Sequence, residues 1–336
     1  MKAVWYTRQG PAAEVLLCGE QPTPAPGTGE VLVRLHASAV NPADAKRRAG
    51  GPLFPMDDPL VIPNSDGAGV IEAVGAGVDG SRIGERVWLC FGQRGRALGT
   101  AAEFICLAEE FVTRLPDGLD FAAGATLGIP CMTAHCGVFL DGPVAGKTIL
   151  VTGGAGAVGH YAIQLAKWGG AVVFATTSTA DKARHAERAG ADGVIDYVSE
   201  DVAARIMDLT AGRGVDRIID VDAGANLECG LRVLRSGGVW VSYAIGSEPS
   251  LQLPLAKLIR GNLALRGLYL PGVSGEARRG AQRAISRWLG EARAPILAVD
   301  RVFPLRDSAA AHLAVEKGNK IGTVVVDCTT ESEVLT

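Results

Sequence analysis

The sequence contains no C-x-x-C pair, although it has seven cysteines among its 336 residues. Their number is odd and their spacing is scattered, which argues against a disulfide framework. A structural zinc site with four cysteine ligands is not expected either, because such sites use closely spaced pairs. We therefore expect free thiols, with Cys131 and Cys136 buried in a helix.

Long apolar runs are also missing, and neither sign of charge dominates. No segment approaches the 18 residues of a transmembrane helix, and the first residues, MKAVWYTRQG, have no apolar signal-peptide core. A net charge of -3 does not suggest a nucleic-acid or anionic-membrane partner. Basic clusters such as Lys46-Arg47-Arg48 are more simply explained as solvated helix faces than as a nucleic-acid site. The sequence thus predicts a soluble, cytoplasmic protein.

The most informative segment is glycine-rich and spans residues 148–167. A short β-branched run is followed by glycines and then by apolar residues at helical spacing, which predicts strand, tight turn and helix. Gly154, Gly156 and Gly159 match the G-x-G-x-x-G spacing of dinucleotide-binding proteins. In such a turn the first glycine bends the chain, the second admits a pyrophosphate, and the third packs the helix on the strand.

The start of the helix completes this candidate phosphate site. Free amide N–H groups around Ala157 and Val158, together with the helix dipole, are expected to face the phosphates. An ordinary turn between a strand and a helix has the same glycines. A second β-branched strand expected at 171–177 favours the dinucleotide interpretation.

The pattern of elements changes along the chain and predicts an α/β fold class with three segments. Residues 1–124 contain short strands and Gly/Pro-rich turns, among them an alternating strand at 30–40 with His36 on its polar, solvent-facing side. Residues 125–264 alternate between strands and helices, which predicts a doubly wound, parallel, six-stranded sheet. Residues 265–336 return to the mixed composition of the first segment. Six strands are expected in the alternating part, at 148–152, 171–175, 193–196, 217–221, 239–244 and 263–268.

With these patterns identified, the chain resembles the zeta-crystallin-like NADPH:quinone oxidoreductases, which are zinc-independent medium-chain dehydrogenases/reductases. The likeness covers almost the whole chain, and six stretches carry it: 37–50 (ASAVNPADAKRRAG), 62–78 (IPNSDGAGVIEAVGAGV), 128–135 (GIPCMTAH), 145–171 (AGKTILVTGGAGAVGHYAIQLAKWGGA), 190–197 (GADGVIDY) and 318–326 (GNKIGTVVV). The resemblance implies a GroES-like β-rich catalytic domain, a Rossmann domain, and an assembly that is usually a homodimer and sometimes a tetramer.

The resemblance, together with the residues after the second strand, implies NADPH as the cofactor. The position that carries an acidic residue in NAD-binding proteins has none here. Ser178, Lys182 and Tyr197 match the family's contacts to the 2′-phosphate, where a hydroxyl and a positive charge are favourable. Alternatively, Ser178 caps the following helix and Lys182 is a solvated surface charge.

Further cofactor contacts are implied by position in the family. Asn41 and Thr133 would lie near the nicotinamide, and Lys320 would reach the phosphates, although Asn41 could also simply cap the following helix. The remaining implied contacts follow the last two strands of the alternating segment: Ala244, Ile245, Gly246, Leu268, Tyr269 and Leu270.

No metal is expected. The places of the catalytic zinc ligands in related alcohol dehydrogenases hold Asn41, Ser65 and Ile129, which are not soft ligands. Lys46 stands where related reductases often have tyrosine. It could stabilise an oxyanion or point to solvent.

The predicted activity is an NADPH-dependent reduction of a quinone by direct hydride transfer, with no dedicated general acid. A reductase of alkenals or enoyl compounds has the same hydride geometry and stays open as an alternative. A non-catalytic NADPH-binding redox sensor is the third hypothesis.

Overall fold

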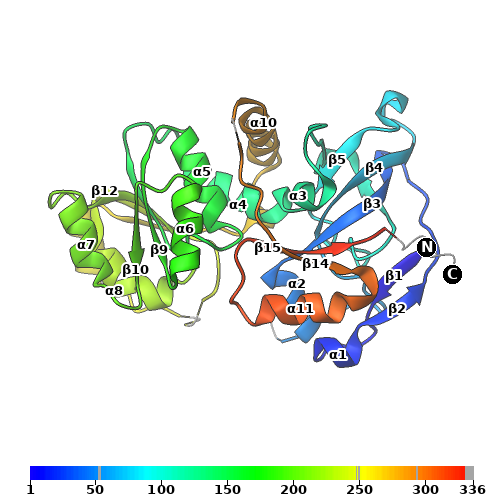
Figure 1. The fold of residues 1–336 in the computed structure, drawn as a ribbon, viewed down its shortest axis with the longest axis horizontal. Coiled ribbons are helices and arrows are strands. Elements are labelled where there is room, and N and C mark those ends of the chain that lie inside the picture. Colours follow the sequence, from blue (N-terminus) through cyan, green and yellow to red (C-terminus); the bar gives the residue numbers. More distant parts are fainter. Residues whose placement is uncertain (52–53, 247, 249, 293, 330–336) are drawn as a thin grey trace. The chain divides into compact units, whose positions relative to one another are not determined.

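A computed structural model describes residues 1–51, 54–246, 248, 250–292 and 294–329. The chain forms two compact units (Figure 1). The first unit contains the chain up to Ile129 and from Leu297 onward, and the second contains Pro130–Ile296. No helix in the described part of the chain combines the length and the hydrophobicity that crossing a bilayer requires.

The first unit is built on a mixed sheet in which β3, Glu30–Val40, is the central strand. β3 pairs antiparallel with β4, β6 and β15, so the segment after residue 297 supplies a strand beside the N-terminal ones. The other strands of this sheet are β4 (Asp66–Val74), β5 (Arg86–Leu89), β6 (Phe104–Ala108), β7 (Val112–Arg114), β14 (Val299–Pro304) and β15 (Thr323–Asp327). A separate antiparallel pair consists of β1 (Lys2–Trp5) and β2 (Leu17–Glu20).

Short helices complete the first unit: α1 (Ala12–Val15), α2 (Pro42–Ala49), α3 (Phe121–Ala125), α11 (Ser308–Glu316) and the single 3-10 turns Gly80–Arg82, Glu109–Phe111 and Leu305–Asp307. A π-helical turn, Leu127–Cys131, follows α3. The chain breaks there because Gly128 has non-helical angles (φ -61°, ψ -118°) and Pro130 has no amide hydrogen.

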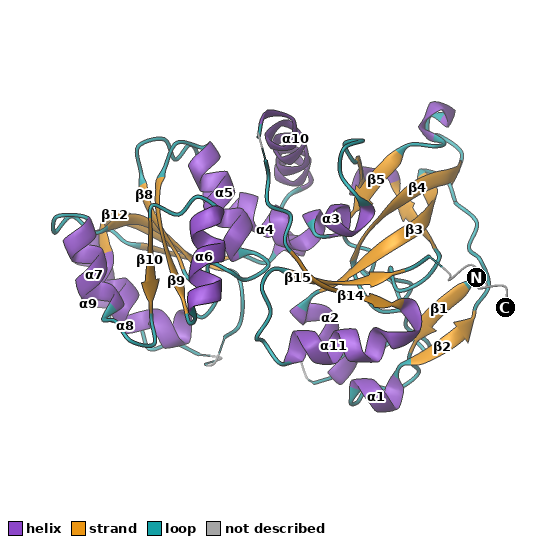
Figure 2. Cartoon of the chain, viewed as in Figure 1, coloured by secondary structure: helices purple, strands orange, loops and turns teal. Residues whose placement is uncertain are grey.

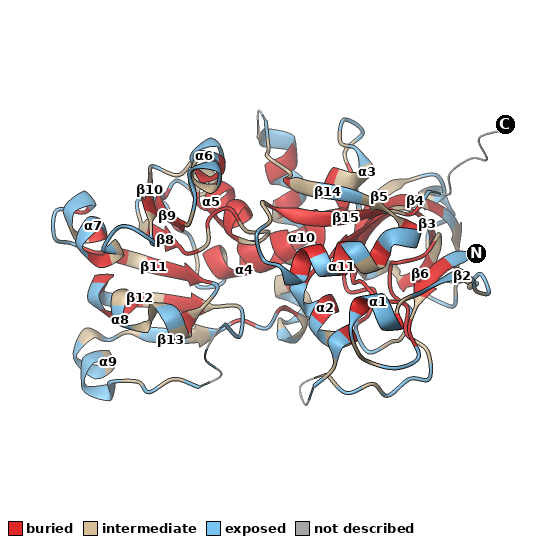
Figure 3. Cartoon of the chain, turned by 60° about the horizontal axis from the view of Figure 1, so that its bottom comes forward, coloured by how far each residue is buried: buried red, intermediate tan, exposed pale blue. Residues whose placement is uncertain are grey.

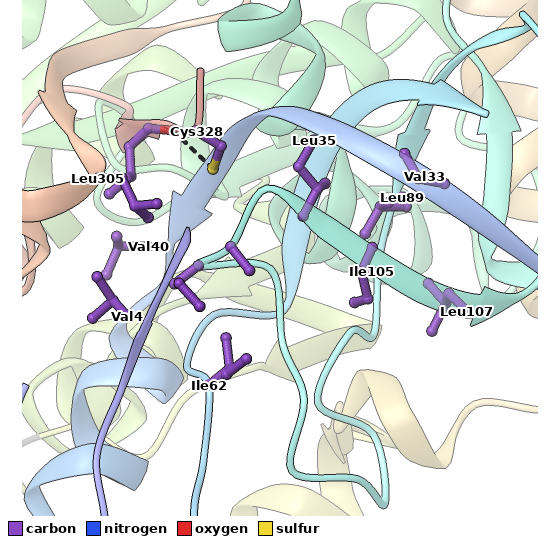
Figure 4. Packing of buried hydrophobic residues seen from close by; sticks show 14 of the residues in the cluster. Val4, Val33, Leu35, Val40, Ile62, Leu89, Ile105, Leu107, Leu305 and Cys328 are labelled. Atoms are coloured by element: carbon purple, nitrogen blue, oxygen red, sulfur yellow. Dashed lines mark hydrogen bonds between the residues drawn. The ribbon is translucent and has the colours of Figure 1, made fainter. Parts of the chain in front are cut away.

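The predicted alternation of β3 is confirmed on its apolar side. Val31, Val33, Leu35 and Ala37 are all buried in the core of the unit. Figure 3 shows β3 among the buried strands, and Figure 4 shows Val33 and Leu35 within the core. Leu89 and Ile105 pack in the same cluster. The opposite side of β3 is different from the prediction, because His36 is half-buried.

The ring of His36 stacks on Phe121 of α3, with 4.2 Å between ring centroids. Burial lowers the pKa of His36, with a further contribution from the charge of Arg34. The prediction that His36 faces solvent is therefore wrong, because its ring forms a packing contact between β3 and α3. Sequence alternation could not reveal it, because α3 is about eighty residues further along the chain.

The second unit contains the predicted parallel sheet. All of its neighbouring strands run parallel, in the order β10-β9-β8-β11-β12-β13. This is the order 3-2-1-4-5-6 of the doubly wound dinucleotide-binding fold. The strands are β8 (Thr148–Val151), β9 (Val172–Thr177), β10 (Gly193–Asp196), β11 (Val215–Asp220), β12 (Leu234–Ser242) and β13 (Ala264–Gly267).

Crossover helices cover both faces of this sheet, with α5 beside α6 on one face and α7 beside α8 on the other (Figure 2). The helices of the unit are α4 (Met132–Phe139), α5 (Gly159–Trp168), α6 (Ala180–Arg188), α7 (Val202–Leu209), α8 (Ala223–Val233), α9 (Leu255–Gly261), α10 (Gly275–Glu291) and the 3-10 turn Leu270–Gly272.

The chain returns to the first unit at residue 297 rather than at the expected residue 265. β13 is hydrogen-bonded to β12, and α10 packs on α4, so both belong to the second unit. The composition of 265–296 resembles that of the first segment because α10 is an exposed amphipathic helix. It buries one side, including Ala281, Ile285 and Trp288.

Candidate active site

The predicted cofactor residues of the second unit lie at one edge of its sheet. Parallel strands bring their carboxyl ends together, and ligands of this fold bind just beyond that edge. The glycine turn follows β8, Ser178 follows β9, and Tyr197 follows β10. The loop with Ala244, Ile245 and Gly246 follows β12, and Leu268, Tyr269 and Leu270 follow β13.

Three glycines of the turn have a conformational or steric reason, although the roles differ from the expected ones. Gly153, and not Gly154, has the left-handed conformation that bends the chain (φ +64°). A Cβ at Gly154 would lie 2.8 Å from the Cβ of Ala175, so this glycine allows the turn to pack on β9. A Cβ at Gly159 would lie 2.3 Å from the carbonyl oxygen of Gly153, which confirms close packing between helix and turn.

Gly156 has more space around it than its neighbours. The only atom near its missing Cβ, among the described residues, is the carbonyl oxygen of Gly153 at 3.2 Å. The amide N–H groups of Ala157, Val158 and Gly159 have no hydrogen-bond acceptor within the described ranges. The N-cap residue Val158 offers no side-chain cap to α5. Unsatisfied amides at a helix start can bind an anion, so these three remain the candidates for a phosphate contact.

Ser178 and Lys182 come together beyond β9. The ammonium Nζ of Lys182 donates a hydrogen bond of 3.3 Å to the Ser178 hydroxyl. Thr179, not Ser178, caps α6, because its hydroxyl accepts the amide N–H of Lys182. The alternative in which Ser178 is the cap is therefore wrong, and the half-buried Lys182 is not a fully solvated charge.

Tyr197 directly follows β10, the strand next to β9. The backbone amide of Tyr197 donates to the carbonyl oxygen of Thr177. Asp196, the last residue of β10, is the partner of Thr177 in the parallel pairing of the two strands. The Tyr197 side chain is 54% exposed. The Ser178–Lys182 pair and an exposed tyrosine thus follow the carboxyl ends of two neighbouring strands.

Asp220 is a buried residue at the end of β11 that the sequence did not single out. Its Oδ1 accepts from the Thr152 hydroxyl at 2.5 Å and from Asn226 Nδ2 at 2.8 Å, and its Oδ2 accepts from Trp240 Nε1 at 2.9 Å. This carboxyl group therefore joins the ends of β8 and β11 to β12 and α8, and it fixes the base of the glycine turn. Its partners are far apart in sequence, so no local pattern reveals it.

The other implied contacts have different exposures. Thr133 is buried on α4, and Leu268 and Leu270 are buried, whereas Tyr269 is 73% and Ile245 is 55% exposed. Lys320 belongs to the first unit, where its Nζ donates to the carbonyl oxygen of Gly322 at 2.6 Å.

The first unit contains a compact polar cluster formed by Asn41, Asp44, Ser65, Asp66 and Ile129. Asn41 Nδ2 and the amide of Ile129 both donate to Asp66 Oδ2, at 2.7 Å and 2.9 Å. The backbone amide of Asn41 donates to Asp44 Oδ2 at 2.8 Å, and the Ser65 hydroxyl donates to Asp44 Oδ1 at 3.0 Å. Asn41 occupies the N-cap position of α2 in a capping box with Asp44, and its side-chain Nδ2 also donates to Asp66.

Burial dominates the electrostatics of this cluster. It raises the pKa of Asp44 to about 6, against stabilising hydrogen bonds from Asn41 and Ser65, and it raises the pKa of Asp66 well above the usual range. The Oδ1 atom of Asp66 has no hydrogen-bond partner within the described chain. It lies against Gly128, where a Cβ would be 2.2 Å away, so only glycine fits beside the carboxyl group.

Asn41, Ser65 and Ile129, which occupy the positions of the zinc ligands in related alcohol dehydrogenases, lie in one cluster, but their chemistry does not suit zinc. Asn41 and Ser65 donate hydrogen bonds to carboxyl groups, and Ile129 contributes a backbone amide. No three His, Cys, Asp or Glu side chains in the described residues gather as a metal-ligand set. Lys46 is exposed on α2.

The two units define a dehydrogenase/reductase with a GroES-like domain and a doubly wound nucleotide-binding domain. The family described as "Alcohol dehydrogenase GroES-like domain" matches residues 27–117, and "Zinc-binding dehydrogenase" matches residues 157–286. A quinone oxidoreductase of Rattus norvegicus is 33% identical over 258 residues, which are 75% of each chain.

Two other proteins extend the likeness to nearly the full length. A 2-haloacrylate reductase of Burkholderia sp is 30% identical over 335 residues, or 97% of this chain and 98% of the relative. The structure of Escherichia coli quinone oxidoreductase complexed with NADPH superposes with a TM-score of 0.84 at 25% identity, covering 97% of this chain and 100% of that one. The chain belongs to the quinone oxidoreductase family of medium-chain dehydrogenases/reductases.

Proposed function

We propose that this protein is an NADPH-dependent quinone reductase. The observation that carries the proposal is the edge of the parallel sheet, where uncapped amides of α5 and the Ser178–Lys182 pair lie at the ends of neighbouring strands. The related quinone oxidoreductases, one of them complexed with NADPH, support the same assignment.

The residues at this edge fit the phosphates of NADPH. The space at Gly156 and the amides of Ala157, Val158 and Gly159 suit the pyrophosphate, since unpaired N–H groups at a helix start favour negative charge. Ser178 and Lys182 suit the 2′-phosphate, because a hydroxyl and an ammonium can both donate to it. Tyr197 would border the same phosphate, and Lys320 is the further candidate for a phosphate contact.

The bound cofactor supplies a hydride, so the chain needs to supply position rather than chemistry. A quinone is already electrophilic, and water can protonate the reduced product. Asn41, held between Asp44 and Asp66, is proposed to orient the nicotinamide together with Thr133. The loop residues Ala244, Ile245 and Gly246 and the segment Leu268, Tyr269 and Leu270 are proposed to border the ring and exclude water.

The decisive experiment follows the loss of NADPH absorbance with a panel of quinones and 2-alkenals. We expect turnover of quinones with NADPH at a higher kcat/KM than with NADH. Tight NADPH binding without turnover of any acceptor would instead identify a redox sensor and remove the proposal.

A second candidate function is reduction of an activated C=C bond. The near full-length likeness to a 2-haloacrylate reductase favours it. A kcat/KM for 2-alkenals or haloacrylate well above that for every quinone would establish this alternative, since the site would bind the same cofactor in both cases.

We also propose that the protein forms a homodimer in the cytoplasm. In the described chain β13 pairs with β12 alone, so its other edge leaves N–H and C=O groups available. Leu265 of β13 and Leu255 and Ile259 of α9 are exposed apolar side chains, 37%, 66% and 73% exposed. All seven cysteines are free thiols, as in proteins of reducing compartments. Sedimentation tests the homodimer, and cell fractionation tests the cytoplasmic location.

A further inference from the structure

Gln93 lies in the turn that follows β5, and its side-chain amide is buried without a partner. The residue is 3% exposed, and neither Nε2 nor Oε1 forms a hydrogen bond with any residue of the described chain. A buried amide without hydrogen bonds costs about 1–3 kcal/mol, so such groups are rare in folded proteins and need an explanation.

The backbone around Gln93 is held in place from two sides. The amide of Gly92 donates to the carbonyl oxygen of Ser65 at 2.8 Å, and Arg47 Nη1 donates to the carbonyl oxygen of Gln93 at 3.2 Å. Ser65 belongs to the polar cluster with Asp44, and Arg47 lies on α2, which Asn41 begins. The turn is thus tied to the elements that present Asn41.

The turn also contains backbone strain. Phe91 has φ +67°, a left-handed conformation that a bulky residue rarely adopts. It is only 2% exposed and packs edge-on against Phe111, with ring centroids 5.5 Å apart. A strained residue followed two positions later by an unpaired buried amide is typical of a binding site, where the surrounding structure sustains both costs.

We propose that Gln93 is a specificity-determining residue that binds the acceptor's carbonyl oxygen through its amide Nε2. A hydrogen bond there strengthens as negative charge develops on that oxygen during reduction. The Oε1 atom can accept from a ring hydroxyl of the reduced product. The inference rests on the proposed reductase function, because the acceptor class is the quinone or a similar carbonyl compound.

The variant Gln93→Met tests this inference, because methionine has a similar length and removes the amide. The matched control is Thr323→Val on β15. The Thr323 hydroxyl is also buried without a partner in the described chain, and it belongs to no proposed site. Removing an unsatisfied buried polar group stabilises the fold, so both variants should have a higher Tm than the wild type.

The two variants are expected to differ in acceptor binding. Gln93→Met should lower kcat/KM for 1,4-naphthoquinone about tenfold, which corresponds to one lost hydrogen bond of about 1.4 kcal/mol. It should weaken naphthoquinone binding, measured by quenching of tryptophan fluorescence without cofactor, by a similar factor. Thr323→Val should change neither quantity.

Two results would overturn the inference while leaving the proposed function intact. One is an unchanged kcat/KM and quenching constant in Gln93→Met, and the other is a lower Tm, which would show that the amide has a structural partner. A wild-type protein that reduces no carbonyl acceptor would remove the proposed function. The quenching comparison would then still decide whether Gln93 binds quinones.

Discussion

Asp66 in the first unit and Asp220 in the second are both fully buried aspartates at the end of a strand, but their surroundings differ. Asp220 accepts four hydrogen bonds, from Thr152, Asn226, Trp240 and its neighbour Asp222, spread over both oxygens. Asp66 accepts two with its side chain, both on Oδ2, and its Oδ1 lies against Gly128.

The difference indicates two uses of a buried carboxyl group. With four donors, Asp220 holds strands and a helix together beneath the nucleotide edge of the sheet. With two donors and full burial, Asp66 has a pKa well above its usual range, because burial disfavours the charged carboxylate. Its Oδ2 atom positions Asn41 and Ile129 by accepting one hydrogen bond from each.

The largest expected effect comes from removing the better-connected carboxyl group. Asp220→Ala would leave the Thr152 hydroxyl, Asn226 Nδ2 and Trp240 Nε1 without their acceptor, and we expect a loss of about 3–5 kcal/mol in the free energy of unfolding. Urea denaturation followed by tryptophan fluorescence measures it.

The matched control for that variant is Asp201→Ala in the same unit. Asp201 also accepts two amide N–H groups, at the start of α7, but it is exposed. The free energy of unfolding should fall clearly less in Asp201→Ala than in Asp220→Ala. Equal losses would contradict the role of Asp220 as a buried connection between strands.

The pH dependence of stability should distinguish the first unit from the second. Burial raises the pKa of Asp44 from 3.8 to about 6, so between these values the folded chain holds a proton that the unfolded chain has released. Stability from this group is present below pH 4 and is lost as the pH rises through 6. Asp44→Asn can keep both contacts, because its oxygen accepts from Asn41 and its NH₂ donates to Ser65. Relative to wild type it should gain about 3 kcal/mol between pH 4 and 8.

An exposed carboxylate provides the control with the opposite sign. The amide of Ser81 lowers the pKa of Asp79, so that group stabilises the fold above pH 4 and loses its contribution as the pH falls. Relative to wild type, Asp79→Asn should become less stable as the pH rises from 2 to 6. A flat difference for Asp44→Asn in thermal melts across the same buffers would show that its proton is not held by burial.

Local sequence patterns were sufficient for most of the fold and for the nucleotide edge. The alternation of strands with helices predicted the parallel sheet, and its topology then placed the glycine turn, Ser178 and Tyr197 at one edge. Residues that act through distant partners could not be predicted in this way. Asp220 depends on contacts with residues from other elements, and the left-handed residue of the turn proved to be Gly153.

The glycine turn offers a contrast between packing and binding within a single motif. Gly159→Ala would place a Cβ 2.3 Å from the Gly153 carbonyl oxygen and should destabilise the fold by about 2 kcal/mol. Gly156→Ala has only the contact of 3.2 Å and should leave Tm nearly unchanged while weakening NADPH binding. Calorimetric titration and thermal melts of both variants separate the two effects. A large Tm loss in Gly156→Ala would refute the assignment of that position to ligand approach.

The smallest effect concerns the choice between the two nicotinamide cofactors. Ser178→Asp would put a carboxylate next to Lys182, where it would repel a 2′-phosphate but could accept a hydrogen bond from a ribose hydroxyl. We expect the Kd for NADPH to rise about tenfold, or about 1.4 kcal/mol, with little change for NADH.

Ser178→Ala is the control, because it removes the hydroxyl without adding a charge and should weaken NADPH binding less. Since Thr179 caps α6, neither variant should lower Tm appreciably. Equal weakening of both cofactors by Ser178→Asp would mean that the end of β9 does not recognise the 2′-phosphate.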